Sequence, residues 1–204
     1  MTRRIRIRGL RVAGLLVVAI AASAAVLGDQ VPGASSSTAA SPIDVLRSEP
    51  RGALGEVDGA VPDSATVFDD HIPGVANLDS ELLGALRQAA MDAAAGGVEF
   101  VVDSGWRSPE YQEHLLREAV SKYGSAEEAA RWVAAPNRSA HVSGDAVDIG
   151  PADASAWLSE HGAEYGLCQI YGNEPWHYEL HPEAASEGCP APYADPTEDP
   201  RMQQ

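Results

Sequence analysis

Three short stretches rich in histidine, acidic residues and arginine constrain this chain more than any other feature. They are S-G-W-R-S at Ser104–Ser108, S-A-H-V-S-G-D-A-V-D at Ser139–Asp148 and N-E-P-W-H-Y-E at Asn173–Glu179. The side chains of chemical interest in them include two histidines, an aspartate, a glutamate and an arginine. Three metal ligands, a general base and a cation for developing negative charge are what a zinc peptidase requires. The fold must therefore bring three separate segments of the chain to one place.

The charge balance is strongly acidic. The 204 residues include 30 Asp and Glu against 14 Lys and Arg, which gives a formal net charge of −16. A surface of this kind repels phosphate backbones, so the composition argues against nucleic-acid binding. The length suits one ordinary domain with additional segments at its ends.

The N-terminus has the pattern of an export signal. Five arginines lie in the first eleven residues, before the apolar run Val12–Leu27 and its A-x-A-like site Ala22–Ala24. The run of about 16 residues is shorter than the ~20 that span a bilayer comfortably. We predict that residues 1–27 form a signal peptide, with a retained N-terminal membrane anchor as the alternative. Either interpretation places the following domain outside the cytoplasm.

The chain has two cysteines, Cys168 and Cys189. In an exported protein an even count favours a disulfide. The bridge would close a loop of about 21 residues and stabilise the fold by roughly 3 kcal/mol in the chain-entropy model. A pair of thiolate metal ligands is the poorer alternative, because the spacing matches no C-x-x-C pattern.

Composition divides the remainder of the chain into three parts. Residues 28–65 are rich in Ser, Ala, Gly, Pro and Asp, and we predict a flexible linker. Residues 66–189 carry the periodic patterns and form the predicted domain. Residues 190–204 contain several prolines and are predicted to be a loose tail.

Periodicity predicts four helices and four strands in the domain. Leu82, Leu86 and Ala93 recur at helical spacing, and Ser108 followed by Pro109 is typical of a helix start. The helices are predicted over 78–95, 109–123, 125–134 and 153–161. The strands are predicted over 98–103, 145–149, 167–171 and 176–180. This order indicates an α+β fold with a small, mostly antiparallel sheet, helices on one side and the zinc site on the sheet.

His141 and Asp148 form the first candidate pair. Asp148 alternates with Val147 and Ile149, so its carboxylate is expected on the opposite face of a strand. Gly144 permits a sharp turn that would bring His141, in a loop or at a strand end, back beside Asp148. Taken alone, the pair is equally compatible with an ordinary surface loop.

Glu174 and His177 form the second candidate pair. Pro175 favours an extended or turn conformation at Glu174, and Trp176 would supply apolar packing. A glutamate three residues before a ligand histidine suits a general base beside a metal. The alternative is an exposed turn glutamate followed by a half-buried strand histidine, with Glu179 on the same strand face.

Arg107 follows a predicted strand, where a loop arginine can reach a carboxylate or an oxyanion. The alternative for Arg107 is a surface ion pair, which would contribute little to the stability of the fold. The remaining histidines are predicted not to be metal ligands: His71, His114, His161 and His181.

The three stretches resemble those of the VanY-like D-alanyl-D-alanine carboxypeptidases, zinc peptidases that share a fold with Hedgehog signalling domains. The resemblance extends from about Asp69 to Glu179. It implies an exported zinc D,D-carboxypeptidase that removes the C-terminal D-Ala from peptidoglycan stem peptides. It also implies one zinc ion per chain and a monomer on the cell-wall side of the membrane. Related families leave two alternatives, an L-Ala-D-Glu endopeptidase and a zinc-containing wall-binding module that does not cut.

The resemblance also implies a role for each candidate residue. The family pattern S-x-H-x-x-G-x-A-x-D supplies two zinc ligands, which match His141 and Asp148. The pattern E-x-W-H supplies a base and a third ligand, which match Glu174 and His177. The pattern S-G-[YW]-R-S supplies an arginine that steadies the scissile carbonyl, which matches Arg107. Three further positions are implied to bind substrate: Trp106, Gln112 and Ser139.

Overall fold

The computed structural model describes residues 54–203. The predicted export signal and residues 28–53 of the predicted linker lie outside the described residues. In the described part, no helix combines the length and the apolar character needed to cross a bilayer.

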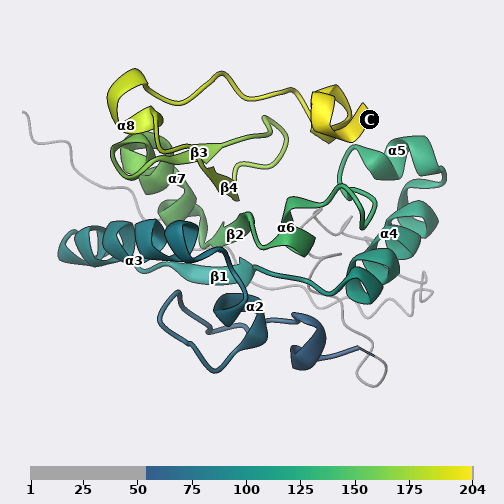
Figure 1. The fold of residues 1–204 in the computed structure, drawn as a ribbon, viewed down its shortest axis with the longest axis horizontal. Helices are drawn as coiled ribbons and strands as arrows, with labels where there is room; N and C mark the ends of the chain where they lie inside the picture. The colour runs from purple at the N-terminus through teal and green to yellow at the C-terminus, as the bar shows by residue number, and fades with distance from the viewer. Residues whose placement is uncertain (1–53, 204) are drawn as a thin grey trace, which may run out of the picture. The chain divides into compact units, whose positions relative to one another are not determined.

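A four-stranded antiparallel sheet in the order β1-β2-β4-β3 forms the centre of the domain (Figure 1). The strands are β1 Val101–Ser104, β2 Ala146–Gly150, β3 Leu167–Gln169 and β4 His177–Leu180. The register pairs Asp148 of β2 with His177 of β4 on one side and with Ser104 of β1 on the other. The second and third of the three sequence stretches therefore meet in the middle of the sheet. The predicted α+β class with an antiparallel sheet is confirmed.

Helices and short 3₁₀ turns surround the sheet. The α-helices are α2 Pro73–Ala76, α3 Ser80–Ala95, α4 Pro109–Tyr123, α5 Ala126–Ala130, α6 Ala140–Ser143, α7 Ala152–His161 and α8 Ala184–Glu187. The 3₁₀ turns are η1 Glu56–Asp58, η2 Gly162–Tyr165, η3 Pro196–Glu198 and η4 Pro200–Gln203. Side-chain caps begin the two longest helices: the Asp79 carboxylate accepts two backbone N–H bonds at α3, and the Ser108 hydroxyl accepts one at α4.

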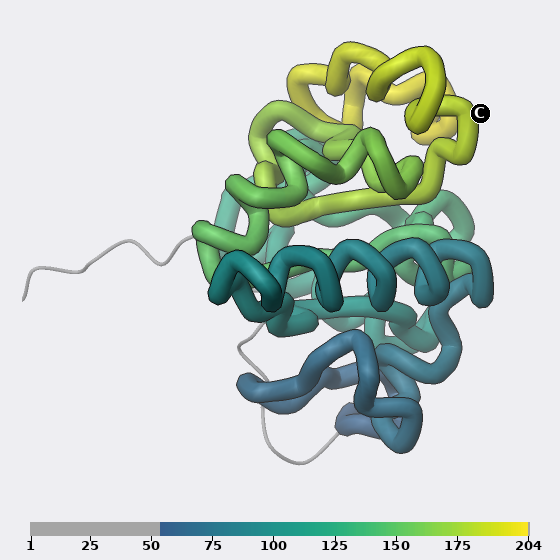
Figure 2. The backbone as a smooth tube through the Cα atoms, turned by 90° about the vertical axis from the view of Figure 1, so that its left-hand side faces the viewer, coloured from purple at the N-terminus to yellow at the C-terminus, as the bar shows by residue number. Residues whose placement is uncertain are grey.

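The main core lies between one face of the sheet and the helices α3 and α7, which lie side by side (Figure 2). Val147 and Ile149 of β2 and Tyr178 of β4 enter this core. Because successive side chains of a strand point to opposite faces, Asp148 and His177 must lie on the other face. The burial of ordinary apolar side chains thus orients the polar site.

A second, smaller core joins α4 to α5 through Tyr111, Leu115, Ala119, Ala129 and Val133. It fixes α4 beside the loop that carries the first stretch.

Several boundaries differ from the sequence predictions. The strand predicted from residue 98 begins at Val101, and the helix predicted to residue 134 ends at Ala130. His141 lies on the short helix α6 and not in a loop or strand end.

The last part of the predicted linker is also packed. The carbonyl of Asp58 accepts a hydrogen bond from the backbone N–H of Ser108 at 2.8 Å. Gly59 adopts a φ of 106°, and a Cβ there would lie 2.2 Å from the carbonyl oxygen of Trp106. Residues 54–65 therefore lie against the domain, because close backbone contacts at Gly59 hold them there.

The prediction of a loose tail is wrong for residues 190–203. Asp195 and Asp199 are buried, and each has a specific partner in the body of the domain. Asp195 forms an ion pair with Arg131 at 2.9 Å, and Asp199 accepts a hydrogen bond from the Tyr171 hydroxyl at 2.9 Å. Figure 1 shows the C-terminal turns next to α5. The proline-rich composition suggested a loose tail, and the partners that hold the segment could not be inferred because they are distant in the sequence.

The predicted disulfide is confirmed. Cys168 of β3 and Cys189 are bonded, so the bridge fixes the start of the C-terminal segment to the sheet.

Candidate active site

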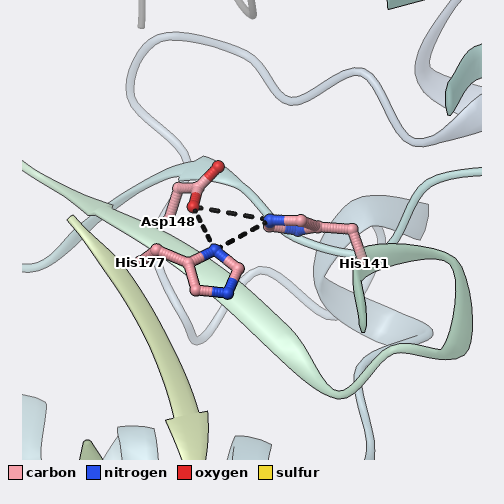
Figure 3. Close-up of side chains that lie close together, drawn as sticks. All are labelled: His141, Asp148 and His177. Atoms are coloured by element: carbon pink, nitrogen blue, oxygen red, sulfur yellow. Dashed lines mark hydrogen bonds and ion pairs between the residues drawn. The ribbon is translucent and has the colours of Figure 1, made fainter. Parts of the chain in front are cut away.

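Three side chains that could hold a metal ion converge on the sheet face opposite the main core (Figure 3). Asp148 comes from β2, His177 from the start of β4 and His141 from α6. The Asp148 Oδ1 atom lies 3.1 Å from His177 Nδ1 and 3.4 Å from His141 Nε2. The two histidine nitrogens lie 3.3 Å apart. All three residues are buried.

These distances fit a tetrahedral metal ion. Zinc bonds of about 2.0–2.1 Å at tetrahedral angles place neighbouring donor atoms about 3.3 Å apart. The three observed separations form a triangle of this size. Two imidazoles and one carboxylate are also a donor set that zinc accepts with a fourth position left open.

Each of the two histidines has a second ring nitrogen, which points away from Asp148. The hydrogen-bond partner of that nitrogen determines which ring nitrogen has a free lone pair for a metal. The backbone carbonyl of Gly105 lies 2.8 Å from His141 Nδ1 and can only accept, so Nδ1 carries the hydrogen. The Glu179 carboxylate lies 3.3 Å from His177 Nε2 and accepts its hydrogen in the same way. The free lone pairs of His141 and His177 therefore both point at Asp148 Oδ1. Lone pairs directed at one point favour a cation between them, either a proton or a metal ion.

Arg107 holds the second oxygen of Asp148. Its guanidinium is buried and donates to Asp148 Oδ2 at 3.0 Å, to the Ser104 hydroxyl at 2.8 Å and to Gln112 Oε1 at 3.0 Å. Gln112 is fixed in turn, because its amide donates to the Ala134 carbonyl at 2.8 Å. Arg107, in the first stretch, therefore fixes the metal set, by which we mean His141, Asp148 and His177, on the side of Asp148 that faces away from the two histidines. The ion pair of Arg107 is buried, so the alternative of a surface ion pair is wrong.

The pKa values of the three converging side chains shift in different directions. Burial raises the pKa of Asp148, but His141 and His177 more than offset this and hold that pKa well below its usual range. Burial and the Arg107 charge lower the pKa of His141. Burial lowers the pKa of His177, but the bonds to Asp148 and Glu179 outweigh it and raise that pKa to about 10. A proton on His177 would compete with a metal, so metal binding should release it.

Glu174 lies beside the metal set with a carboxylate that is only partly satisfied. Its Oε2 lies 3.9 Å from His177 Nδ1, and its buried Oε1 has no hydrogen-bond partner among the described residues. A tight turn positions it: the Glu174 N–H donates to the Tyr171 carbonyl, and the His177 N–H donates to the Glu174 carbonyl. Burial, with a smaller contribution from Asp148, raises the pKa of Glu174 to about 8. A buried carboxyl with a raised pKa next to a metal set is suited to proton transfer near neutral pH.

A small cavity of about 30 Å³ opens onto these groups. Gln112 and Ser139, two of the three predicted substrate contacts, line it. Trp106 does not line this cavity, and its backbone packs against Gly59 and Gly74 instead.

Sequence reasoning missed other residues that line the cavity. They are Trp132, Val133, Ala134, Ala140, Tyr171, Pro196 and Met202. Pro196 and Met202 come from the C-terminal segment, and no local pattern indicates that this segment returns to the site.

The other histidines lie outside this group, in the part of the chain that the structure describes. His114 pairs with Glu118 and His181 with Glu183, each on the surface side of its element. The ring of His161 lies tilted against the ring of Trp157, and His71 is exposed.

The fold and site together define a class, a candidate metal centre on a four-stranded antiparallel sheet. The family model for VanY, described as D-alanyl-D-alanine carboxypeptidase, matches residues 75–183. The chain belongs to this family. The matched region contains all of the converging ligands together with Arg107 and Glu174.

Individual relatives agree with this assignment. A D-alanyl-D-alanine carboxypeptidase from Enterococcus faecalis (strain ATCC 700802 / V583) is 36% identical, over 45% of this chain and 44% of that protein. The chain therefore aligns with less than half of that relative's length. VanYB in complex with D-alanine-D-alanine is similar in structure with a TM-score of 0.51 and 31% identity, covering 54% of this chain and 75% of that one.

A second solved structure bears on the metal. A variant of the vancomycin-resistance D,D-pentapeptidase VanY in complex with Zn(II) gives a TM-score of 0.50 at 27% identity. The match covers 55% of this chain and 80% of that one.

Proposed function

We propose that this protein is a zinc-dependent D,D-carboxypeptidase that removes the C-terminal D-Ala from peptidoglycan stem peptides. The observation that carries the proposal is the triangle of donor atoms from His141, Asp148 and His177 with Glu174 beside it. Family membership supports the reaction class. The relatives bound to Zn(II) and to D-alanine-D-alanine support zinc and a peptide ending in D-Ala.

The chain's own residues supply the proton transfers. A zinc ion, when bound, supplies a Lewis acid that lowers the pKa of water and polarises a carbonyl. Glu174 takes the proton of the attacking water and returns it to the amine of the departing D-Ala. Its raised pKa matches this double task, because a group that titrates near neutral pH can both accept and donate.

Arg107 has a structural and a proposed catalytic part. Its contacts with Ser104, Gln112 and Asp148 account for three of the five N–H groups of a guanidinium. Another N–H of the same group is proposed to donate to the oxyanion that develops at the scissile carbonyl. Gln112 and Ser139, which line the cavity, are proposed to contact the peptide.

The proposed location follows from the substrate. Peptidoglycan lies outside the cytoplasmic membrane, and the predicted signal or anchor at residues 1–27 would bring the domain there. We propose that the domain acts there as a monomer with one zinc ion.

The test is metal-dependent release of D-alanine. Protein dialysed against a chelator should lose activity on a peptide that ends in D-Ala-D-Ala, and added zinc should restore it. Mass spectrometry of the products distinguishes loss of one D-Ala from a cut at an L-Ala-D-Glu bond. Full activity in metal-free protein would contradict the zinc assignment, and an intact D-Ala-D-Ala end beside other products would contradict the substrate assignment.

A further inference from the structure

The C-terminal segment, residues 190–203, lies beyond the region that the family model matches, yet it reaches the metal set. Arg201 makes the connection through Glu179, the hydrogen-bond partner of His177. Its two terminal nitrogens lie 2.7 Å from Glu179 Oε2 and 3.1 Å from Glu179 Oε1. A guanidinium that contacts both oxygens fixes the plane of the carboxylate as well as its position.

Glu179, which Arg201 holds in place, in turn orients the ring of His177. It lies two residues after His177 on β4, on the same face of the strand, and accepts the hydrogen of His177 Nε2 at 3.3 Å. That hydrogen bond keeps the lone pair on Nδ1, the atom that faces the metal position. Arg201 donates to both oxygens of this carboxylate, so towards His177 the carboxylate acts as an acceptor.

Arg201 is itself held in place. Its guanidinium contacts the buried carboxylate of Asp199 at 2.6 Å and lies 3.4 Å from the Tyr171 hydroxyl. The ring of Tyr171 packs against the ring of His177 with centroids 5.1 Å apart. The network therefore contacts His177 twice, once at its Nε2 atom and once at its ring face.

The surroundings explain why Glu179 needs this partner. Glu179 and Arg201 both border a second cavity of about 1000 Å³, separate from the one at the metal set. Without Arg201, the carboxylate could turn towards water in that cavity and release His177. A ligand histidine whose outer hydrogen bond is lost can rotate or change tautomer, which weakens metal binding.

We propose that Arg201 is a positioning residue for the metal ligand His177 and acts through Glu179. The inference rests on the proposed function in one respect, that His141, Asp148 and His177 hold a metal. It adds Arg201, which lies outside the region that the family model matches, to the residues that support the candidate metal site.

The experiment measures metal affinity, which does not depend on turnover. Arg201→Gln should bind zinc about tenfold more weakly than the parent in competition with a chromophoric chelator, the lower end of the 10–100-fold range for outer partners of ligands. Arg201→Lys should restore part of the loss, because it keeps the charge without the two-point contact. The absorption bands of cobalt-loaded Arg201→Gln should change, since they report the orientation of the ligands.

Arg131→Gln is the matched control. It breaks another arginine–carboxylate pair between the body and the C-terminal segment, at Asp195, and the contacts of Arg131 do not include Glu179. Its zinc affinity should stay within twofold of the parent. An equal loss in Arg131→Gln and Arg201→Gln would show that docking of the whole segment matters, and would overturn the specific role of Arg201.

A double substitution tests the route. In a Glu179→Ala background, which should itself lose zinc affinity, Arg201→Gln should have no further effect. A persistent effect would mean that Arg201 acts by another path, and parent-like affinity in Arg201→Gln alone would end the proposal.

His177→Ala distinguishes failure of the proposed metal site from failure of the proposed role of Arg201. If His177→Ala kept the parent's affinity for zinc, the assignment of the metal site would be wrong, and the role of Arg201 would be wrong with it.

Discussion

Glu174→Gln should stabilise the metal-free protein, and the gain should grow with pH. Glu174 is buried, and its Oε1 has no hydrogen-bond partner among the described residues. A glutamine has the same shape and resembles the protonated carboxyl, so the substitution chiefly removes the titration. If Glu174 is the proton acceptor proposed above, this cost in stability accompanies its function.

The magnitude follows from the two pKa values of this carboxyl. Burial raises the pKa of Glu174 to about 8 in the folded protein, whereas the unfolded chain releases the proton near the ordinary value of 4.5. The folded state therefore binds more protons between these values, and parent stability falls as pH rises through this window. At about 1.4 kcal/mol per pH unit, the expected gain from Glu174→Gln is under about 1 kcal/mol at pH 5 and about 3 kcal/mol at pH 7.

Urea unfolding of chelator-treated protein at pH 5, 6 and 7, with the disulfide intact, measures this difference. Glu99→Gln is the matched control, because it makes the same change at an exposed position. A gain for Glu174→Gln that is constant with pH, or that shrinks as pH rises, would refute the reasoning. The same variant should also keep zinc and lose turnover.

Three further predictions concern the site and its support. Glu174→Ala should retain zinc and lose turnover by about 10²–10⁴-fold, whereas His177→Ala should lose zinc, and elemental analysis beside peptide turnover separates the two. Arg107→Gln should weaken zinc binding by about 10–100-fold, because its guanidinium holds a ligand oxygen at 3.0 Å; chelator competition measures this. Unfolded, non-reduced protein should show no free thiol from Cys168 or Cys189, and reduction should lower the free energy of unfolding by roughly 3 kcal/mol.

The site draws its supporting contacts from widely separated elements. The first stretch supports Asp148 through Arg107, and the C-terminal segment supports His177 through Glu179. Each ligand oxygen or nitrogen that does not face the metal position therefore has a protein partner. Such outer contacts hold the donor atoms in place before a metal arrives.

The sequence by itself determined the parts of this protein that depend on local pattern. The alternation of Val147 and Ile149 with Asp148 placed the aspartate on the polar face of a strand, as the structure has it. Ser108 and Pro109 marked the start of α4 correctly. The residue types of the stretches, and the resemblance they carry, also indicated His141, Asp148 and His177 as one set, and the structure brings these side chains together.

Only the tertiary structure decided how the separate segments support one another. The ion pair of Arg131 with Asp195 spans 64 positions, and that of Arg201 with Glu179 spans 22. A contact between distant residues leaves no period and no spacing in the sequence, so the C-terminal segment appeared to be a loose, proline-rich tail. A buried charge pairs with residues on whichever elements the apolar core brings beside it. Those elements become neighbours only when the whole domain has folded, so the sequence alone does not reveal the pairs.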